Sequence, residues 1–236
     1  MKKIIEKLEA KTPVTIVAVG DSNNVICGHT KGHFNWFHHL HLGLCETFGD
    51  GFIYMINSAV CSNTVAMQLQ RMEQDILRWK PDLVIAAFGI NDQGMGLDRI
   101  GEFRENYREF IRQVQGCGAE LLFRTPAPKV FGSGYGDGLP PSAKPGEPWA
   151  GEGGVIGAYA QAIVELGRES DSAVCDHYSA WMKQKLPAMN KFYSYQGLSC
   201  RYKDTLHLNE QGHLAMFREL APLFGMPTRF TYEETF

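Results

Sequence analysis

Short apolar runs that alternate with segments of helical spacing are the feature that most restricts the fold of this chain of 236 residues. Five runs have the apolar character of strands buried on both faces: residues 14–19, 52–56, 83–88, 120–123 and 173–175. Between or after them, apolar residues recur at helical spacing over 69–79, over 103–114 and beyond Asn209, which we expect to cap a last helix. The alternation predicts an α/β fold: a three-layer α/β/α sandwich with about five parallel strands, flavodoxin-like in arrangement.

The charge balance restricts the partners of the chain. Lys and Arg number 23 against 26 Asp and Glu, which gives a formal net charge of −3. This mild acidity argues against nucleic acid or an anionic membrane as partner, because both call for a basic face. Charged residues such as Glu6 and Lys7 interrupt any apolar signal segment, and the run at 14–19 is far shorter than the ~20 residues of a membrane span. We expect one cytoplasmic domain over residues 1–236, without stable membrane insertion and with homo-oligomerisation left open.

Residues 126–154 stand apart because they contain 6 Pro and 8 Gly. A loop longer than about 15 residues in a compact domain is usually functional or disordered. This one leaves the carboxyl end of a predicted strand, where open parallel sheets bind their ligands, and it carries Phe131, Tyr135 and Trp149. We interpret it as a Gly/Pro-rich insertion that is either a substrate-shaping lid or a passive surface excursion.

Two short motifs hold residue types that suit nucleophilic catalysis. The chain has no Gly-x-Ser-x-Gly elbow, no His-Glu-x-x-His helix, no Walker loop and no Gly-x-Gly-x-x-Gly after a strand. It does have Gly20-Asp21-Ser22 directly after its first predicted strand, where a serine projects from the sheet. Near the last helix, Asp204 precedes His207 by three residues and can fold back onto the imidazole from the same turn. Each motif alone is also compatible with an ordinary turn or a helix cap.

Two more motifs follow predicted strands and can stabilise an oxyanion. In Gly89-Ile90-Asn91-Asp92, the Asn91 amide can donate a hydrogen bond to a developing negative charge. In Asn57-Ser58-Ala59-Val60, the backbone N–H of Ala59 can point to the same place. The alternative is that these residues stabilise their own turns. Because parallel strands end at one edge of the sheet, all four motifs are expected to meet there.

The order of the four motifs fits one mechanism. Ser22 would be the nucleophile, His207 its general base and Asp204 the group that orients the base. The N–H groups of Ser22 and Ala59 and the Asn91 amide would form the oxyanion hole. On these motifs the sequence resembles the GDSL, or SGNH, family of serine hydrolases, whose four blocks bear Ser, Gly, Asn and His in this order. The blocks run from Gly20 to His207.

Two positions depart from the family pattern. The first block usually continues with Leu, and this chain has Asn23. The second block usually has Gly, and the residue that we align with it is Ala59. A backbone donor survives that change, and we expect a negative φ at Ala59, because a positive φ would cost a residue with a Cβ roughly 1–2 kcal/mol.

The resemblance implies an enzyme that hydrolyses carboxylic esters through an acyl-enzyme. The family includes esterases, thioesterases, lysophospholipases and carbohydrate deacetylases. We favour short acyl groups, with acetyl esters of carbohydrates as the substrate class, because the chain lacks a long apolar segment that would suit an acyl chain. A thioesterase or lysophospholipase, an acyltransferase on the same triad and a non-catalytic binding module remain the alternatives.

No cofactor or metal is expected. Histidines cluster without acidic or cysteine ligands at a convincing spacing, so we interpret them as helix-surface or loop residues: His29, His33, His38, His39 and His41. The six cysteines are spread along the chain without a Cys-x-x-Cys pair, which favours buried reduced thiols. Aromatic residues at 192–195 and Tyr202 can line the scissile bond or cover the sheet edge.

Overall fold

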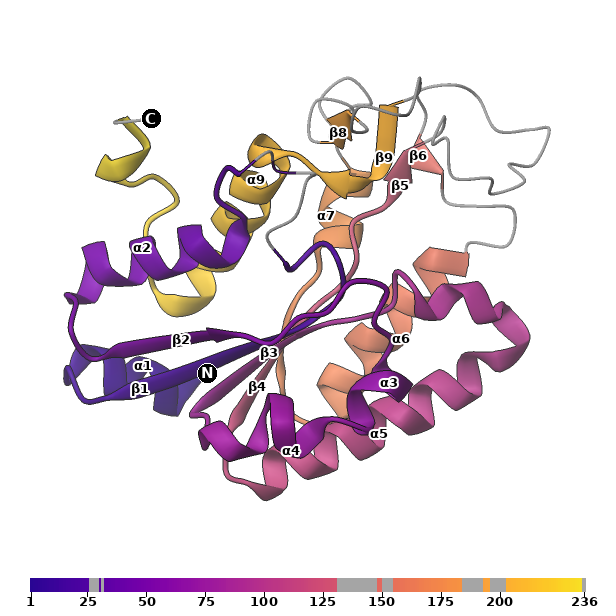
Figure 1. Cartoon of the computed structure of the whole chain (residues 1–236), viewed down its shortest axis with the longest axis horizontal. Coiled ribbons are helices and arrows are strands. Elements are labelled where there is room, and N and C mark those ends of the chain that lie inside the picture. The colour runs from indigo at the N-terminus through magenta and orange to yellow at the C-terminus, as the bar shows by residue number, and fades with distance from the viewer. Residues whose placement is uncertain are drawn as a thin grey trace.

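Five parallel strands form the central sheet of the computed structural model, which describes residues 1–25, 30, 32–130, 148–149, 155–183, 193–195 and 203–234 (Figure 1). Side chains are described for all of these except 129–130, 148–149, 193–195, 203–205 and 234. In spatial order the strands are β2 (Ile53–Asn57), β1 (Val14–Gly20), β3 (Leu83–Ala87), β4 (Glu120–Arg124) and β7 (Ala173–Cys175). Each neighbouring pair is parallel. The predicted fold class and all five predicted strands are confirmed.

Helices cover both faces of the sheet and complete the three layers (Figure 1). One face packs against α1 (Lys2–Glu9), α2 (Trp36–Phe48), α7 (His177–Met182) and α9 (Glu210–Leu220). The other packs against α3 (Val65–Leu69), α4 (Met72–Asp75), α5 (Ile100–Gly116) and α6 (Val155–Glu169). Short 3-10 helices are η2 (Leu77–Trp79), η3 (Asp92–Met95), η4 (Leu97–Arg99), η5 (Ala221–Phe224) and η6 (Thr231–Glu234). The sheet is therefore buried on both faces, as continuous apolar strands require.

The single helix predicted over residues 69–79 is wrong. The segment is divided among the end of α3, the short α4 and η2. Arg71 (φ −124°, ψ 17°) and Ile76 (φ −129°, ψ −65°) interrupt the helical backbone. The Arg71 Nε and the Gln68 side-chain amide both donate to Asp75, at 2.9 and 3.1 Å. These two polar contacts, one buried and one part-buried, stabilise a break in the helix that the apolar spacing alone did not indicate.

The other two predicted helices are confirmed. The apolar stripe at 103–114 lies in α5 and is buried. Asn209 caps α9, because its side-chain oxygen accepts a hydrogen bond from the Gly212 N–H at 2.9 Å. The four apolar residues expected to face inward at this end of the chain are all fully buried: Phe217, Leu220, Ala221 and Phe224.

Two small antiparallel sheets lie outside the central one. β5 (Lys129–Val130) pairs with β6 (Pro148–Trp149), and β8 (Tyr193–Tyr195) pairs with β9 (Lys203–Leu208). β5 and β9 lie side by side (Figure 1). Most of the 126–154 insertion, with Phe131 and Tyr135, lies outside the described residues, so the lid hypothesis stays a prediction. The same holds for the side chains of the aromatic stretch at 192–195 and for Tyr202.

The cysteines are less buried than expected. Cys175 is buried and Cys45 is partly buried, but Cys61 and Cys117 are exposed. The expectation of buried thiols is therefore wrong for two of the four cysteines that the structure describes, and all four are free. In the described part of the chain, no helix is both long enough and apolar enough to cross a membrane.

Candidate active site

Ser22 lies in the turn that follows β1, and its hydroxyl meets the ring of His207. The Ser22 Oγ and the His207 Nε2 are 2.9 Å apart, although 185 positions separate them in the sequence. The turn leaves the strand at Gly20, where φ is +153°. A Cβ at this position would lie 2.5 Å from the Ala87 carbonyl oxygen of β3. Glycine is thus required at the point that places Ser22 at the carboxyl end of the sheet, within hydrogen-bonding reach of an imidazole.

Asn23 joins the same turn to the strand that carries His207. Its side-chain amide donates to the Leu206 carbonyl oxygen at 3.4 Å, and its side-chain oxygen accepts from the Leu208 N–H at 3.3 Å. The two contacts hold the backbone on either side of His207 against the serine turn. The leucine that the family pattern usually has at this position can form neither hydrogen bond, so the departure at Asn23 has a structural consequence.

Asn24 is the centre of a buried hydrogen-bond network behind Ser22. Its carbonyl oxygen accepts from the side-chain amides of Asn35, at 2.8 Å, and Asn57, at 2.7 Å. Its side-chain oxygen accepts from the Trp36 Nε1, at 3.0 Å, and from the Arg124 Nη1, at 2.9 Å. These contacts tie the serine turn to α2, to the end of β2 and to the end of β4. A fully satisfied buried network of this kind fixes one conformation of the turn.

Arg124 is a buried cation at the end of β4. Burial lowers the pKa of its guanidinium to about 10, so it keeps its charge at neutral pH. Its guanidinium carbon lies 3.8 Å from the centre of the Trp36 ring, and its Nε donates to the His177 Nε2 at 3.0 Å. That bond places the His177 proton on Nδ1, which is 2.5 Å from the Glu219 carboxylate. Arg124 is therefore connected to Glu219 through a neutral imidazole.

Cys175, His177 and Glu219 bring three possible metal-ligand atoms within 4.8 Å of one another. The group does not fit a metal well. The Arg124 guanidinium already donates to the His177 ring, and burial raises the pKa of the Cys175 thiol to about 12. A metal prefers a thiolate and an unoccupied imidazole nitrogen, with no fixed cation beside it. We interpret the cluster as part of the hydrogen-bond network that supports the serine turn.

Asp21 precedes Ser22 and is buried. Burial raises the pKa of its carboxyl to about 7, against the opposing effect of the Asn23 N–H, which donates to it at 2.9 Å. The Asp92 carboxylate raises that pKa further, whereas Arg124 and His207 lower it. Asp21 thus titrates near neutral pH beside the candidate nucleophile.

The turn after β2 uses the N–H of Ala59 internally. The Ala59 N–H donates to the Asn57 side-chain oxygen at 3.1 Å, and the φ of Ala59 is not positive, as expected. Ser62 has the left-handed backbone, with φ +61°, that favours glycine. Within the described residues, the N–H groups of Cys61 and Ser62 form no hydrogen bond, whereas those of residues 58, 59, 60 and 63 all do. The turn therefore offers two backbone donors, two to three residues after the predicted one.

Asn91 lies in the turn after β3, and its side-chain amide points at the turn after β2. Its Nδ2 donates to the Asn63 carbonyl oxygen at 3.0 Å, which leaves the second amide hydrogen of this group for another acceptor. The buried Asp92 holds the arrangement: its carboxylate accepts from the Val65 N–H and the Gly89 N–H, both at 2.9 Å. Asn63 also donates to the Gly20 carbonyl oxygen, at 3.3 Å. The turns after β1, β2 and β3 are thereby joined.

Comparison with known proteins identifies the family. A family model described as "GDSL-like Lipase/Acylhydrolase family" matches residues 18–215, which include Ser22, Asn91 and His207. The chain belongs to the GDSL-like lipase/acylhydrolase family. This is the family that the sequence motifs predicted.

Solved structures with the same fold come from carbohydrate esterases. The chain resembles Axe2, an acetylxylan esterase from Geobacillus stearothermophilus, with a TM-score of 0.69 and 16% identity over 93% of this chain and 98% of that one. It also resembles the acetyl xylan esterase AlAXEase, with a TM-score of 0.66 and 20% identity over 89% of this chain and 99% of that one. At these identities the likeness is one of fold.

A curated relative from Bacillus subtilis (strain 168), the uncharacterized lipoprotein YqeF, is 28% identical over 130 residues. The matched region is 50% of this chain and 51% of that protein, so the chain spans about half the length of the relative.

One predicted feature of this GDSL-like chain differs in the structure. Asp204 and His207 were expected in a turn, but both lie in β9. The pairing of β8 with β9 shifts register between Tyr193 and Tyr195, so β9 is an irregular strand. The Asp204 side chain lies outside the described residues, so its contact with His207 stays a prediction.

Sequence reasoning missed the residues that support the site. Arg124 directly follows the predicted strand at 120–123 and was not singled out, and neither was His177. A charged residue directly after the apolar residues 121–123 was a signal of buried function. Asn63 carried no such signal, because Asn is common in turns and its contacts with Gly20 and Asn91 exist only in the folded chain.

Proposed function

We propose that this GDSL-like hydrolase removes short acyl groups, acetyl above all, from carbohydrate esters through an acyl-enzyme on Ser22. The observation that carries the proposal is the 2.9 Å hydrogen bond between the Ser22 Oγ and the His207 Nε2. Such a bond lets an imidazole take the hydroxyl proton as the oxygen attacks a carbonyl carbon.

The proposed reaction proceeds in two halves. The His207 ring takes the Ser22 proton, the Ser22 oxygen bonds to the ester carbonyl carbon, and the resulting imidazolium gives its proton to the leaving alcohol as the ester bond breaks. His207 then takes a proton from water, the hydroxide attacks the acyl-enzyme, and the acid leaves as the proton returns to Ser22. Asp204 is proposed to orient His207 and to support its positive charge.

The proposed oxyanion hole combines the second hydrogen of the Asn91 amide with backbone N–H groups. The Ser22 N–H is one of them. We propose the Ser62 N–H in place of the Ala59 N–H, because the latter already donates to Asn57. Ser62 directly precedes Asn63, whose carbonyl oxygen is bound to the Asn91 amide, so the donor lies on the same turn as that contact. Preorganised donors of this kind stabilise the tetrahedral intermediate.

The preference for short acyl groups rests on the sequence, which lacks a long apolar segment that would suit an acyl chain. A small cavity of about 20 Å³ lies behind the serine turn, with Asp21, Asn23, Arg124 and Met216 among its lining residues. Neither Ser22 nor His207 lines it, so its size does not bear on the length of the acyl group.

Acetylated sugars are supported as the substrate class by the fold shared with two acetylxylan esterases. The test is a series of p-nitrophenyl esters with two to twelve acyl carbons, together with acetylated saccharides. The proposal expects the highest kcat/KM at two carbons and release of acetate from the saccharides. Rates that rise toward twelve carbons would contradict it.

A further inference from the structure

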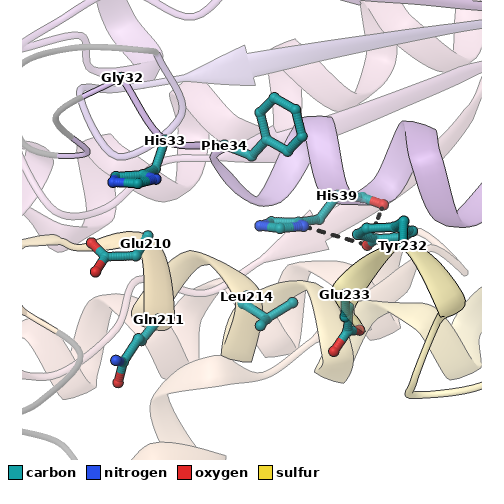
Figure 2. Close-up of a pocket in the computed structure, with 9 residues that line it drawn as sticks. All are labelled: Gly32, His33, Phe34, His39, Glu210, Gln211, Leu214, Tyr232 and Glu233. Carbon is teal, nitrogen blue, oxygen red and sulfur yellow. Dashed lines mark hydrogen bonds between the residues drawn. The ribbon is translucent and has the colours of Figure 1, made fainter. Parts of the chain in front are cut away.

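A second cavity, of about 490 Å³, lies between α2 and α9 (Figure 2). His33 and Phe34 line it ahead of α2, and Glu210 and Leu214 line it from α9. The described C-terminal residues form one end of the cavity through Tyr232. Its volume lies within the range of about 300–1,000 Å³ that is usual for small-molecule sites.

The end of the cavity formed by η6 is firmly attached to α2. The Glu46 carboxylate accepts from the Thr231 N–H at 2.9 Å, and the Tyr232 hydroxyl donates to the His39 carbonyl oxygen at 3.3 Å. Phe230 packs beside Gly43, where a Cβ would lie 3.1 Å from the phenyl ring. Glu233 is paired with Arg218 of α9. The wall is thus a built part of the fold.

Flat rings and acidic groups set the chemistry of this cavity. The His39 ring stacks between Phe217 and Tyr232, at centroid distances of 5.8 and 5.9 Å. Burial lowers the pKa of His39 to about 4, so this ring is neutral at physiological pH. Among the described residues, the lining includes the carboxylates of Glu210 and Glu233 but no Lys or Arg.

That combination disfavours anions and suits a neutral ring with hydroxyl groups. A pyranose presents C–H faces that pack on aromatic rings, and its hydroxyls donate hydrogen bonds to carboxylates. A phosphate or a carboxylate ligand would face the carboxylate of Glu210, and the guanidinium of Arg218 is already paired with Glu233.

The cavity adjoins the candidate catalytic pair along both of its walls. Glu210 follows His207 by three residues, a length of chain that spans at most about 11 Å. On the opposite wall, Phe34 directly precedes Asn35, whose side chain donates to the Asn24 carbonyl oxygen at 2.8 Å. Asn24 belongs to the serine turn. The cavity therefore borders the segments that carry Ser22 and His207, although neither of these two side chains lines it.

We propose that the cavity between α2 and α9 binds a neutral pyranose ring of the sugar that carries the ester, with Phe34 as a stacking surface and Glu210 as a hydrogen-bond acceptor. The inference rests on the proposed function and adds the location and chemistry of its leaving-group site.

The test compares two esters that share an acetyl group. Acetylated xylobiose has a sugar to fill the cavity, and methyl acetate does not. Phe34→Ala removes a partly exposed ring, and Trp79→Ala is its matched control, because the two side chains are 38% and 39% exposed and Trp79 lies near the amino end of β3. We expect the ratio of kcat/KM for acetylated xylobiose to that for methyl acetate to fall about tenfold in Phe34→Ala, as the loss of an aromatic contact suggests, and to stay at the wild-type value in Trp79→Ala.

The inference would be overturned if the ratio of kcat/KM for acetylated xylobiose to that for methyl acetate in Phe34→Ala stays within twofold of the wild-type ratio. It would also be overturned if the wild type prefers acetylcholine, a cationic ester, and Phe34→Ala removes that preference. Binding of xylobiose to Ser22→Ala, measured by calorimetry, separates this inference from the proposed function. If the wild type hydrolyses neither ester, the proposed function fails. In that case, xylobiose binding that Phe34→Ala weakens about tenfold would still support the cavity as a sugar site. Absence of that binding overturns the cavity as a sugar site even in an active esterase.

Discussion

The serine turn and the cavity between α2 and α9 lie close together but are built in opposite ways. In the turn, Asp21 and Asn24 are buried, and each forms several hydrogen bonds. In the cavity, the wall formed by η6 is held by hydrogen bonds and ring stacking, but the side chains of His33, Phe34 and Glu210 are exposed. Reacting atoms must be placed within fractions of an ångström, whereas a sugar can be held by looser contacts. Under the two proposals above, the difference separates groups that determine the rate from groups that determine the choice of alcohol.

This comparison predicts two kinds of kinetic defect. Substitutions in the turn network should lower the turnover of every ester alike. Substitutions in the cavity should change the ratio between esters that differ in their alcohol.

Ser22→Ala should have the largest effect. Without the nucleophile, kcat for p-nitrophenyl acetate should fall by about 10⁴-fold or more, because the acyl-enzyme cannot form. Ser22 is partly buried in a turn, so the thermal midpoint should change little. Initial rates and calorimetric melting check the two parts. A variant with wild-type turnover would exclude Ser22 as the nucleophile.

Asn91→Ala should lower kcat by roughly 10²–10³-fold, with a smaller change in KM, because the amide is proposed to act on charge that develops in the transition state. The loss should be the same for methyl acetate and acetylated xylobiose. If only KM rises, and only for acetylated xylobiose, Asn91 takes part in binding the alcohol. That result would contradict the division of roles between the serine turn and the cavity.

Asp21→Asn should remove a pH-dependent part of the stability. The folded pKa of about 7 lies above the ordinary value of 3.8, so between these limits the folded chain holds a proton that the unfolded chain has lost. The stability from this group is therefore present at low pH and is lost as pH rises from about 4 to about 7, by up to about 1.4 kcal/mol per pH unit. The free energy of unfolding, measured with urea at pH 5, 6, 7 and 8, should rise in the variant relative to the wild type up to about pH 7. A difference between the two proteins that is the same at all four pH values would contradict the raised pKa of Asp21.

Asn23→Leu should have the smallest effect, a fall of about tenfold in kcat. It removes the two hydrogen bonds that hold β9 beside the serine turn, each worth about 1 kcal/mol, and restores the residue that the family pattern usually has. Asn23→Gln is a useful control, because it keeps the amide but shifts its position. Equal rates in the wild type and in Asn23→Leu would show that other contacts suffice to position His207.

The sequence was sufficient for the sheet and for the residues that follow its strands. Continuous apolar runs at 14–19 and 83–88 identify buried parallel strands, and the geometry of such sheets brings Ser22 and Asn91 to one edge. The Ser22–His207 contact followed from the motifs. The break in the helix expected at 69–79 could not be predicted from apolar spacing, because it depends on polar side-chain contacts of Asp75 with Arg71 and Gln68.

The polar support of the site was also beyond the sequence. Arg124 and His177 are 53 positions apart, and nothing local indicates that one donates to the other. The oxyanion donor shows the same limit: Ala59 has the expected φ, but its N–H is taken by Asn57, a contact that block alignment does not reveal. Spacing identifies which turns converge, and side-chain packing decides which donors in them remain available.

The most direct test of the central claim is to locate a fluorophosphonate adduct by mass spectrometry in the wild type and in His207→Gln. If Ser22 is the nucleophile and His207 its base, the wild type should carry the adduct on the peptide that contains Ser22, and the variant should react far more slowly. An adduct on another residue, or equal labelling of Ser22 in both proteins, would contradict the account.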